Sequence, residues 1–315
     1  SVSGVEYGAW KQIDGNAAVT FSNISNPNAV ISVMTPNTYV FEWEVNNGRC
    51  DSLTDTVIIT VFEKPLANAG VDITMCNAAD VNIQSYFTHI NGYHKYNWTY
   101  YAAGSKTASA PTIVTPTTSN TNITGLGVGE YSFILEVSNA ICASSYDTVK
   151  VIVFGKPTVD FISVKTSVCL GEEINFTDLS TIQDSSGSVI NSLVWNLGDG
   201  TNNSSTGFAH TYGNIGDYTI NLIVTSDNGC KDTLERSNYI KVNPLPIADF
   251  DYSPKEITTQ EQVVIRDLSI DGVLYFYSFG DGGFSTNSAP VYNYKDTGNY
   301  IITQIVENAF GCRDT

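Results

Sequence analysis

The sequence predicts an all-β protein in which four small β-sandwiches follow one another in an extended array. Three observations lead to this prediction: a strand-like stretch that recurs along the chain, an aromatic residue upstream of each copy, and short proline-containing junctions. In the clearest case, residues 216–233 and residues 298–315 share nine identities. Such self-similarity is typical of a repeated structural unit.

Each repeat has a strand-like stretch that begins near a tyrosine and ends near a cysteine. Between Tyr131 and Val137, and between Tyr218 and Val224, every second residue is apolar. Alternation with period two predicts a strand that buries one face. The cysteines that close these stretches are 82 to 92 residues apart, which is the size of one immunoglobulin-like sandwich. The four tyrosines are Tyr39, Tyr131, Tyr218 and Tyr300.

An aromatic residue precedes each of these tyrosines, and we expect it on a central strand. In the third and fourth repeats it lies beside a Gly-Asp-Gly, residues 198–200 and 280–282, where a tight turn requires positive φ. We expect these aromatic residues to form the structural core with the four tyrosines. They are Trp10, Trp98, Trp195 and Phe279.

Proline-containing junctions divide the chain into four expected domains. Proline fixes φ and restricts the residue before it, so these junctions predict stiff boundaries. Four sandwiches end to end would span on the order of 100–150 Å. The expected domains are 1–63, which lacks its N-terminal strands, 64–154, 155–243, and 244–315, which lacks its last strand. We expect frayed edges at both ends of the chain, because an incomplete sandwich exposes unpaired strands.

Composition disfavours several classes of function. The chain has 32 acidic and 15 basic residues and a net charge of −17, which disfavours binding to nucleic acid or anionic membrane. It has no long apolar run, so membrane insertion is not expected. A signal peptide is not visible, so we expect a mature or excised piece of a longer protein. Nucleophile-elbow, zincin and P-loop motifs are absent from the sequence, and we expect a non-enzyme. His89, His94 and His210 do not form a metal-binding set.

The six cysteines predict structural disulfides. No C-x-x-C motif occurs, which disfavours a zinc or redox site. Wide spacing in a Lys-poor chain indicates an oxidising, extracytoplasmic compartment. The simplest pairing stays within domains, and each bond would close a loop of over sixty residues and stabilise by roughly 3–5 kcal/mol. The expected bonds are Cys76–Cys142 and Cys169–Cys230, and the cysteines expected to be unpaired in this segment are Cys50 and Cys312.

The third repeat resembles a polycystic-kidney-disease-type (PKD) domain. Its stretch "WNLGDGTNNSSTGFAHTYGNIGDYTINLIVTSDNGC" contains aromatic-x-x-Gly-Asp-Gly, then His210-x-Tyr212, then Gly-x-Tyr218. The fourth repeat is similar but has Tyr292 in place of the histidine, and the first two lack the Gly-Asp-Gly. The resemblance implies tandem immunoglobulin-like (PKD-type) β-sandwiches, with PKD domains at 155–243 and 244–315.

Cysteine-bearing repeats that end in Gly-Cys-x-Asp-Thr resemble those of large gliding-motility adhesins of the Bacteroidota. That resemblance implies type IX secretion, export across the outer membrane and an extracellular, cell-surface location. It also implies a structural stalk that serves surface attachment. The expected partners are adjacent domains of the same chain, with surface polysaccharide or the secretion and motility machinery as further candidates.

A carbohydrate-binding accessory segment of a secreted polysaccharide hydrolase is the alternative function. It would use exposed rings of two aromatic clusters, residues 98–101 and 275–279. If Trp98 and Phe279 point into the core, strand alternation turns Tyr101 and Phe276 outward. We favour core packing for most of these rings.

The remaining candidate sites are acidic turns and acceptor hydroxyls. Asp199 and Asp281 could contribute to a calcium site that stiffens the chain, but the favoured interpretation is that each caps its own turn. No other cofactor is expected. The triplets Asp-Ser/Thr-aliphatic resemble bacterial O-glycosylation acceptors. The acceptor hydroxyls belong to Ser52, Thr56, Thr148 and Thr233.

Overall fold

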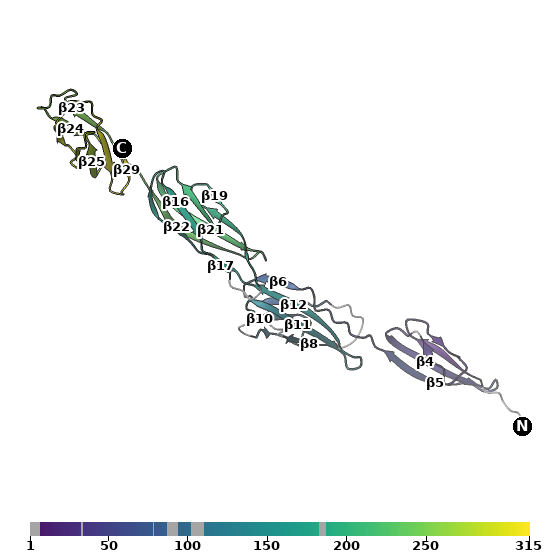
Figure 1. Cartoon of the computed structure of the whole chain (residues 1–315). Coiled ribbons are helices and arrows are strands. Elements are labelled where there is room, and N and C mark those ends of the chain that lie inside the picture. Colours follow the sequence, from purple (N-terminus) through teal and green to yellow (C-terminus); the bar gives the residue numbers. More distant parts are fainter. Residues whose placement is uncertain (1–6, 33, 78, 87–93, 102–109, 183–186) are drawn as a thin grey trace. The chain divides into compact units, whose positions relative to one another are not determined.

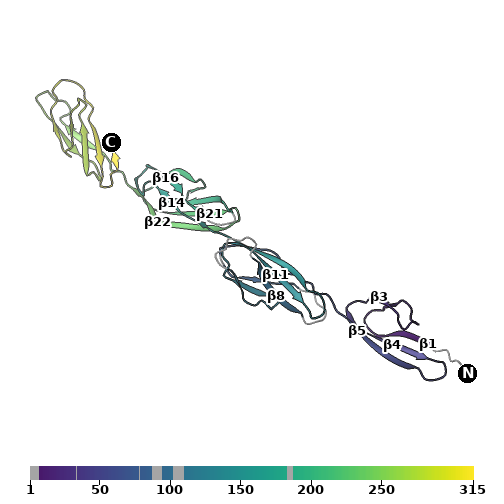
Figure 2. The same ribbon diagram turned by 60° about the horizontal axis from the view of Figure 1, so that its bottom comes forward.

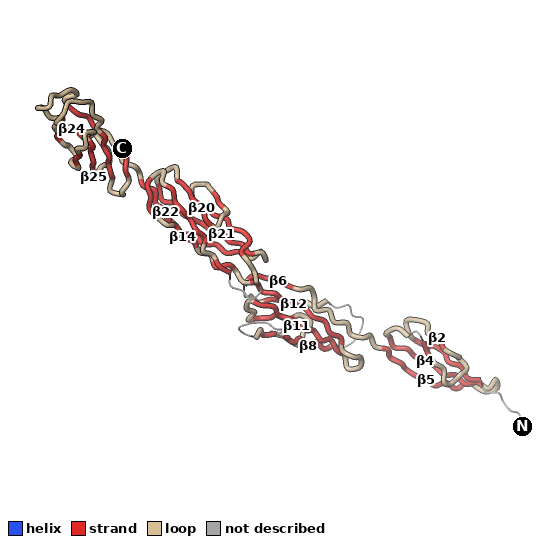
Figure 3. The backbone as a smooth tube through the Cα atoms, viewed as in Figure 1, coloured by secondary structure: helices blue, strands red, loops and turns tan. Residues whose placement is uncertain are grey.

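The computed structural model confirms the all-β prediction. Every regular element among the residues it describes is a β-strand (Figures 1 and 3). The same residues include no helix long and apolar enough to cross a membrane. The chain forms two compact units, Ser1–Val153 and Phe154–Thr315, and each contains two sandwich domains. The described residues are 7–32, 34–77, 79–86, 94–101, 110–182 and 187–315.

The first domain is built on one antiparallel sheet of order β1-β4-β5, beside a short β2–β3 pair (Figure 2). Its central strand carries Tyr39 and Phe41, which are both fully buried. The Trp10 ring lies 5.1 Å from that of Trp43, directly opposite it in the sheet, and is half-buried. The strands are β1 (Tyr7–Asp14), β2 (Thr20–Phe21), β3 (Ile31–Ser32), β4 (Asn37–Asn46) and β5 (Leu53–Val61).

The second domain has two sheets, β6-β12-β11-β8 and β7-β10-β9. Strand β11 shows the predicted alternation, because Tyr131, Phe133, Leu135 and Val137 are all fully buried. Trp98 lies opposite Leu135 on the neighbouring strand and packs into the same core. The strands are β6 (Ile73–Cys76), β7 (Val81–Ile83), β8 (Lys95–Tyr101), β9 (Thr112–Ile113), β10 (Thr121–Thr124), β11 (Gly129–Ser138) and β12 (Ser145–Phe154).

The third domain has a five-stranded sheet, β15-β22-β21-β18-β19, facing the sheet β14-β16-β20, with a short β13–β17 pair. The long strand β22 lies between β21 and β15, and β15 runs parallel to its last residues. The strands are β13 (Pro157–Thr158), β14 (Phe161–Ser163), β15 (Ser167–Cys169), β16 (Glu173–Asp178), β17 (Thr181–Ile182), β18 (Ile190–Asn196), β19 (Asn202–Asn203), β20 (Gly207–Thr211), β21 (Gly216–Ser226) and β22 (Lys231–Asn243).

The fourth domain has sheets β26-β25-β28-β29 and β23-β24-β27. Its last strand has two residues, whereas the equivalent strand β22 of the third domain has thirteen. Asp314 lies opposite Val306, and Asp232 of the third domain lies opposite Val224. The last strands of the two domains therefore begin in the same register. The strands are β23 (Phe250–Ser253), β24 (Val263–Asp267), β25 (Leu274–Ser278), β26 (Phe284–Ser285), β27 (Val291–Tyr292), β28 (Thr303–Glu307) and β29 (Arg313–Asp314).

A tyrosine corner lies at the start of the cysteine-ended strand in the first three domains and just before β28 in the fourth. Each hydroxyl donates a hydrogen bond to the carbonyl four residues earlier, which ties the strand to the loop that enters it. Tyr39 and Tyr131 are buried, and Tyr218 and Tyr300 are half-buried. The bonds are Tyr39 to Thr35 (2.9 Å), Tyr131 to Gly127 (3.0 Å), Tyr218 to Asn214 (2.7 Å) and Tyr300 to Asp296 (3.1 Å).

The side chain of the central aromatic residue donates a hydrogen bond that recurs in all four domains. This hydrogen bond shows which residue of the fourth domain takes the tryptophan position. The indole of Trp195 donates to Ser205 O at 3.0 Å, and the hydroxyl of Tyr277 donates to Ser288 O at 3.2 Å. Tyr277 therefore occupies the tryptophan position, and Phe279, predicted as a core residue, is buried beside it. Phe279 lies two residues further along, at the start of the turn. The tryptophans of the first two domains make the same bond, Trp10 to Asn26 O and Trp98 to Thr118 O.

Candidate functional site: two turn clamps and a disulfide junction

The Gly-Asp-Gly turn of the third domain is held closed by its own aspartate. Asp199 Oδ1 accepts hydrogen bonds from the backbone N and the hydroxyl of Thr201, at 2.9 and 2.6 Å. Asp199 Oδ2 lies 2.8 Å from His210 Nε2. Gly198 has a φ of 81°, and a Cβ there would lie 2.7 Å from Thr219 O. The turn thus requires glycine and ties its strand to β20.

The fourth domain makes the same arrangement with a different residue. Asp281 Oδ1 accepts from Gly283 N at 2.9 Å, and the Tyr292 hydroxyl lies 2.9 Å from both carboxylate oxygens. Tyr292 therefore replaces His210 without loss of the bond. We call each Asp, with its His or Tyr partner, a turn clamp.

The tyrosine two residues after each clamp partner, Tyr212 or Tyr294, holds the other side of the turn. The hydroxyl of Tyr212 donates to Leu197 O at 3.1 Å, and that of Tyr294 donates to Phe279 O at 3.0 Å. Burial raises the pKa of Tyr294 to about 12, so this hydroxyl stays protonated and remains a donor. The motif that carries the resemblance to PKD domains therefore has a structural role in both domains.

The carboxylate of Asp199 is held in its charged form. Burial by itself raises the pKa of this carboxyl, but hydrogen bonds from Thr201 and His210 outweigh it, and the pKa is lowered. A lowered folded-state pKa stabilises the domain above the unfolded-state pKa, and this stability is lost as the pH falls through the folded-state value.

His210→Phe should therefore destabilise the third domain by about 1–2 kcal/mol, because Asp199 loses a donor. His210→Tyr is the matched control, because it copies Tyr292 and should keep most of that stability. The difference between these variants should shrink as the pH falls below the unfolded-state pKa of an aspartate, about 3.9, and through the lowered folded-state pKa of Asp199. Chemical denaturation at pH 7 and pH 3 measures this difference in the free energy of unfolding. Equal stability of the two variants at pH 7 would contradict the clamp.

The clamps favour the turn-capping interpretation of Asp199 and Asp281 over a calcium site. Their carboxylate oxygens are engaged with the turn and its partner strand, whereas calcium takes six to eight oxygen ligands. In the part of the chain that the structure describes, no group of three or more His, Cys, Asp or Glu residues could hold a metal ion. His89 lies outside the described residues.

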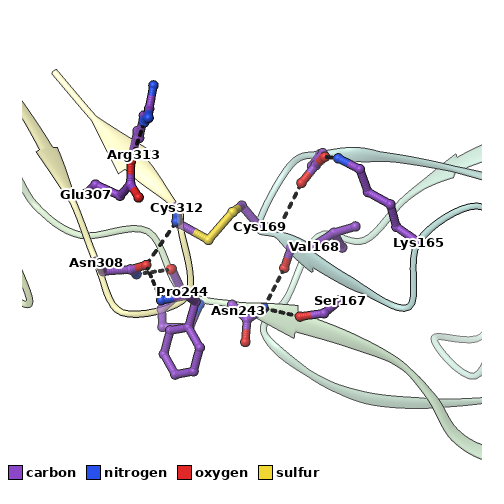
Figure 4. The surroundings of a disulfide bond; sticks show 12 residues. Lys165, Ser167, Val168, Cys169, Asn243, Pro244, Glu307, Asn308, Cys312 and Arg313 are labelled. Atoms are coloured by element: carbon purple, nitrogen blue, oxygen red, sulfur yellow. Dashed lines mark hydrogen bonds and ion pairs between the residues drawn. A yellow bond between two sulfur atoms is a disulfide. The ribbon is translucent and has the colours of Figure 1, made fainter. Parts of the chain in front are cut away.

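A disulfide bond joins the third domain to the fourth. Cys169 and Cys312 are bonded, with Cα atoms 5.5 Å apart, and Figure 4 shows them meeting at the domain junction. The prediction that Cys169 pairs with Cys230 is wrong, as is the prediction that Cys312 is unpaired.

The proposed Cys76–Cys142 bond is also wrong, because Cys142 is a free thiol. Cys76 and Cys230 are each disulfide-bonded. Cys50 is free and exposed.

The length of β21 explains why the within-domain pairing fails. Cys169 lies beside Asn243 at one end of the sheet, where Val242 pairs with Gly216. Cys230 follows the other end of β21, where its backbone N bonds the Ser226 hydroxyl. The eleven residues of β21 span on the order of 30 Å. A disulfide requires Cα atoms within about 7 Å, so the two cysteines are too far apart.

Asn308 fixes the hairpin that presents Cys312. Its Oδ1 accepts from Cys312 N at 3.0 Å, and its Nδ2 donates to Pro244 O in the junction at 2.8 Å (Figure 4). On the other side, Asn243 Nδ2 donates to Ser167 Oγ at 2.8 Å. Sequence reasoning missed Asn308. An asparagine shortly before Cys142 makes the same kind of bond to the cysteine N, and this repetition was the available signal.

The final Asp of the Gly-Cys-x-Asp-Thr motif also holds a junction. Asp314 Oδ2 accepts a hydrogen bond from Ala248 N at 2.9 Å. In the second domain, Asp147 Oδ2 accepts from Ala69 N at 2.7 Å. The second domain lacks the Gly-Cys-x-Asp-Thr motif but has an Asp-Thr at this point of its last strand. An aspartate of the last strand therefore fastens the start of each of these two domains.

The other candidate residues lie on the surface of separate domains. Tyr101 and Phe276 are 61% and 40% exposed, which agrees with the outward orientation that strand alternation predicts. The Phe276 ring stacks against Phe284 at 5.9 Å. The four candidate O-glycosylation residues, Ser52, Thr56, Thr148 and Thr233, are all exposed.

Tandem sandwiches with tyrosine corners and turn clamps define an immunoglobulin-like β-sandwich protein. The PKD domain family matches residues 155–242 and 243–315, just over half of the sequence. The chain belongs to the PKD domain family. PKD and immunoglobulin-like domains are typically non-catalytic modules, and disulfide-bonded ones are typical of extracellular proteins.

Similar proteins include a collagenase, a metalloprotease and a further Vibrio protein. Collagenase ColA of Clostridium perfringens is 28% identical over 123 residues, which is 38% of this chain and 11% of the collagenase. The chain therefore spans about a tenth of the length of this curated relative. The PKD1 domain of Vibrio cholerae metalloprotease PrtV is 27% identical, with a TM-score of 0.24, and covers 28% of this chain and 98% of that domain. The PKD1 domain of Vibrio anguillarum Epp is 25% identical, with a TM-score of 0.24, over 28% of this chain and 96% of that domain.

Proposed function

We propose that this chain is a structural stalk segment of a large, secreted, cell-surface adhesin of the SprB-like gliding-motility type, exported by type IX secretion. The observation that carries the proposal is the Cys169–Cys312 bond between consecutive PKD domains. A bond of this kind persists in oxidising surroundings outside the cytoplasm. The net charge of −17 disfavours self-association of neighbouring stalks.

The position of the bond suits a segment that bears tension. It closes a loop with a sequence separation of 143 residues, which contains most of both PKD domains. Tension along the chain reaches Cys169, crosses the disulfide and leaves after Cys312. The core of the fourth domain therefore lies outside the covalent path of the load, whereas Phe161 and Val168 of the third core precede Cys169 and stay in it.

Antibodies against this chain test the proposal on the cells that produce it. We expect labelling of intact cells without permeabilisation, and loss of attachment or gliding when Fab fragments are added. Fab fragments against an unrelated surface protein are the control. Labelling that requires lysis, or attachment and gliding that persist with saturating Fab, would reject the proposed role.

Carbohydrate binding is a second candidate, and the exposed Phe276–Phe284 pair favours it. Two stacked, exposed rings on one sheet face provide a flat apolar surface of the kind on which a sugar ring can stack. Polysaccharide pull-down with Phe276→Ala should then lose binding, whereas Tyr101→Ala, in another domain, should keep it. If the original chain and both variants are retained equally by the polysaccharide, the Phe276–Phe284 pair is not a carbohydrate site.

Glycosylation remains a further proposal for the four exposed hydroxyls. Thr56 and Thr233 each follow an aspartate, and the carboxylate of that aspartate accepts a hydrogen bond from the backbone N of the threonine. A glycosylated protein isolated from its native cells would show these positions in its intact mass and peptide map.

A further inference from the structure

The short junction between the third and fourth domains contacts the chain segments of both bonded cysteines. On the third-domain side, Asn243 lies opposite Cys169 in the parallel ladder of β22 and β15. Asn243 Nδ2 donates to Ser167 Oγ at 2.8 Å (Figure 4), and Asn243 O accepts from Leu170 N at 2.9 Å. The segment that carries Cys169 is therefore fastened to Asn243 on both sides of the cysteine.

Pro244, the next residue, fastens the segment that carries Cys312. Pro244 O accepts a hydrogen bond from Asn308 Nδ2 at 2.8 Å. Asn308 Oδ1 in turn accepts from the backbone N of Phe310 and of Cys312, each at 3.0 Å. Asn308 is 5% exposed, so water competes little for these bonds. We call Asn243, Pro244 and Asn308 the junction hub.

A second contact crosses the same junction beside the hub. Lys241 Nζ, on β22 of the third domain, lies 5.6 Å from the ring centroid of Phe310, in the hairpin of the fourth domain. A cation over an aromatic face is attracted by the ring. Phe310 is 56% exposed, so its ring contributes to the junction more than to the core of its own domain.

We infer that the junction hub is a docking surface between the two PKD domains and that docking is energetically coupled to the Cys169–Cys312 bond. The hub and the bond join the same two segments, so the hub raises the effective concentration of one thiol at the other. Such coupling is reciprocal, because contacts that favour the bond are favoured by it to the same extent. The reduced junction is then a reversible joint, which the disulfide locks.

Redox titration of the full chain with glutathione measures this coupling. One cysteine thiolate attacks oxidised glutathione and releases one glutathione thiolate, and the other cysteine thiolate then displaces the second glutathione and closes the protein disulfide. Alkylation of the remaining thiols and peptide mapping report the Cys169–Cys312 pair separately from the other cysteines. We expect Asn308→Ala to lower the equilibrium constant for closing this bond about tenfold, because three side-chain hydrogen bonds at the junction are lost.

Asn139→Ala is the matched control for this titration. Asn139 Oδ1 accepts from Cys142 N at 2.6 Å in the second domain, where Cys142 is a free thiol, so this variant should leave the constant unchanged. Phe310→Ala removes the contact with Lys241 and should lower the constant about threefold.

Hydrogen exchange of the β25 and β28 amides shows in each variant whether the fourth domain is folded. Because the ring of Phe310 is exposed, Phe310→Ala tests the junction even where Asn308→Ala weakens the fold. An unchanged constant in either folded variant of the fourth domain would overturn the inference. A decrease of the same size with Asn139→Ala would also overturn it, because the effect would then not belong to this junction.

Discussion

Cys312→Ser should release up to about 250 Å of additional length when the chain is pulled from its ends. With the Cys169–Cys312 bond intact, the fourth domain cannot extend, because the load crosses the two sulfur atoms. Without the bond, the fourth domain enters the path of the load and residues 244–312 can unfold under tension, where an extended residue spans at most about 3.3–3.6 Å. Single-molecule stretching under non-reducing conditions measures the difference.

Cys142→Ser is the matched control for that experiment, since it makes the same substitution at a free thiol. Its extension should equal that of the original chain. In the absence of force, the chain-entropy model gives a loss of about 4–5 kcal/mol in the free energy of unfolding for Cys312→Ser. If Cys312→Ser extends no further than the original chain, the disulfide does not divert the load and the mechanical argument fails.

Trp195→Ala should lower the free energy of unfolding of the third domain by about 3–5 kcal/mol. The side chain is fully buried, and its ring lies 5.2 Å from Phe161 and 5.4 Å from Phe208. Truncation leaves a cavity among these rings and also removes the indole bond to Ser205 O. Both losses act in the centre of the core, where the two sheets meet.

Val194→Ala is the control for the tryptophan, because it lies on the same strand with its side chain turned outward and 48% exposed. Its effect should stay within about 0.5 kcal/mol. Since the chain has several domains, exchange of the β21 amides is a better measure than a single melting temperature. Similar losses for the two variants would show that Trp195 does not organise this core.

Local pattern was sufficient to predict the strands and their buried faces. In β11, the period-two alternation of Tyr131 to Val137 matches the observed burial, because strand geometry sends successive side chains to opposite faces. The same rule placed Tyr101 and Phe276 outward. Pattern failed where two aromatic residues lay close together in the fourth domain. Tyr277 and Phe279 share a strand face, so alternation could not decide which of them takes the tryptophan position.

The sequence by itself determined the all-β class, the repeated Tyr-headed strand and the tight Gly-Asp-Gly turns, because each depends on residues that are neighbours in the chain. Only the tertiary structure decided which cysteines pair. Cys169 and Cys230 lie at opposite ends of one sheet, whereas Cys312 comes within bonding distance of Cys169 across the junction. Such proximity depends on where strand ends meet after folding, and spacing along the chain does not encode it.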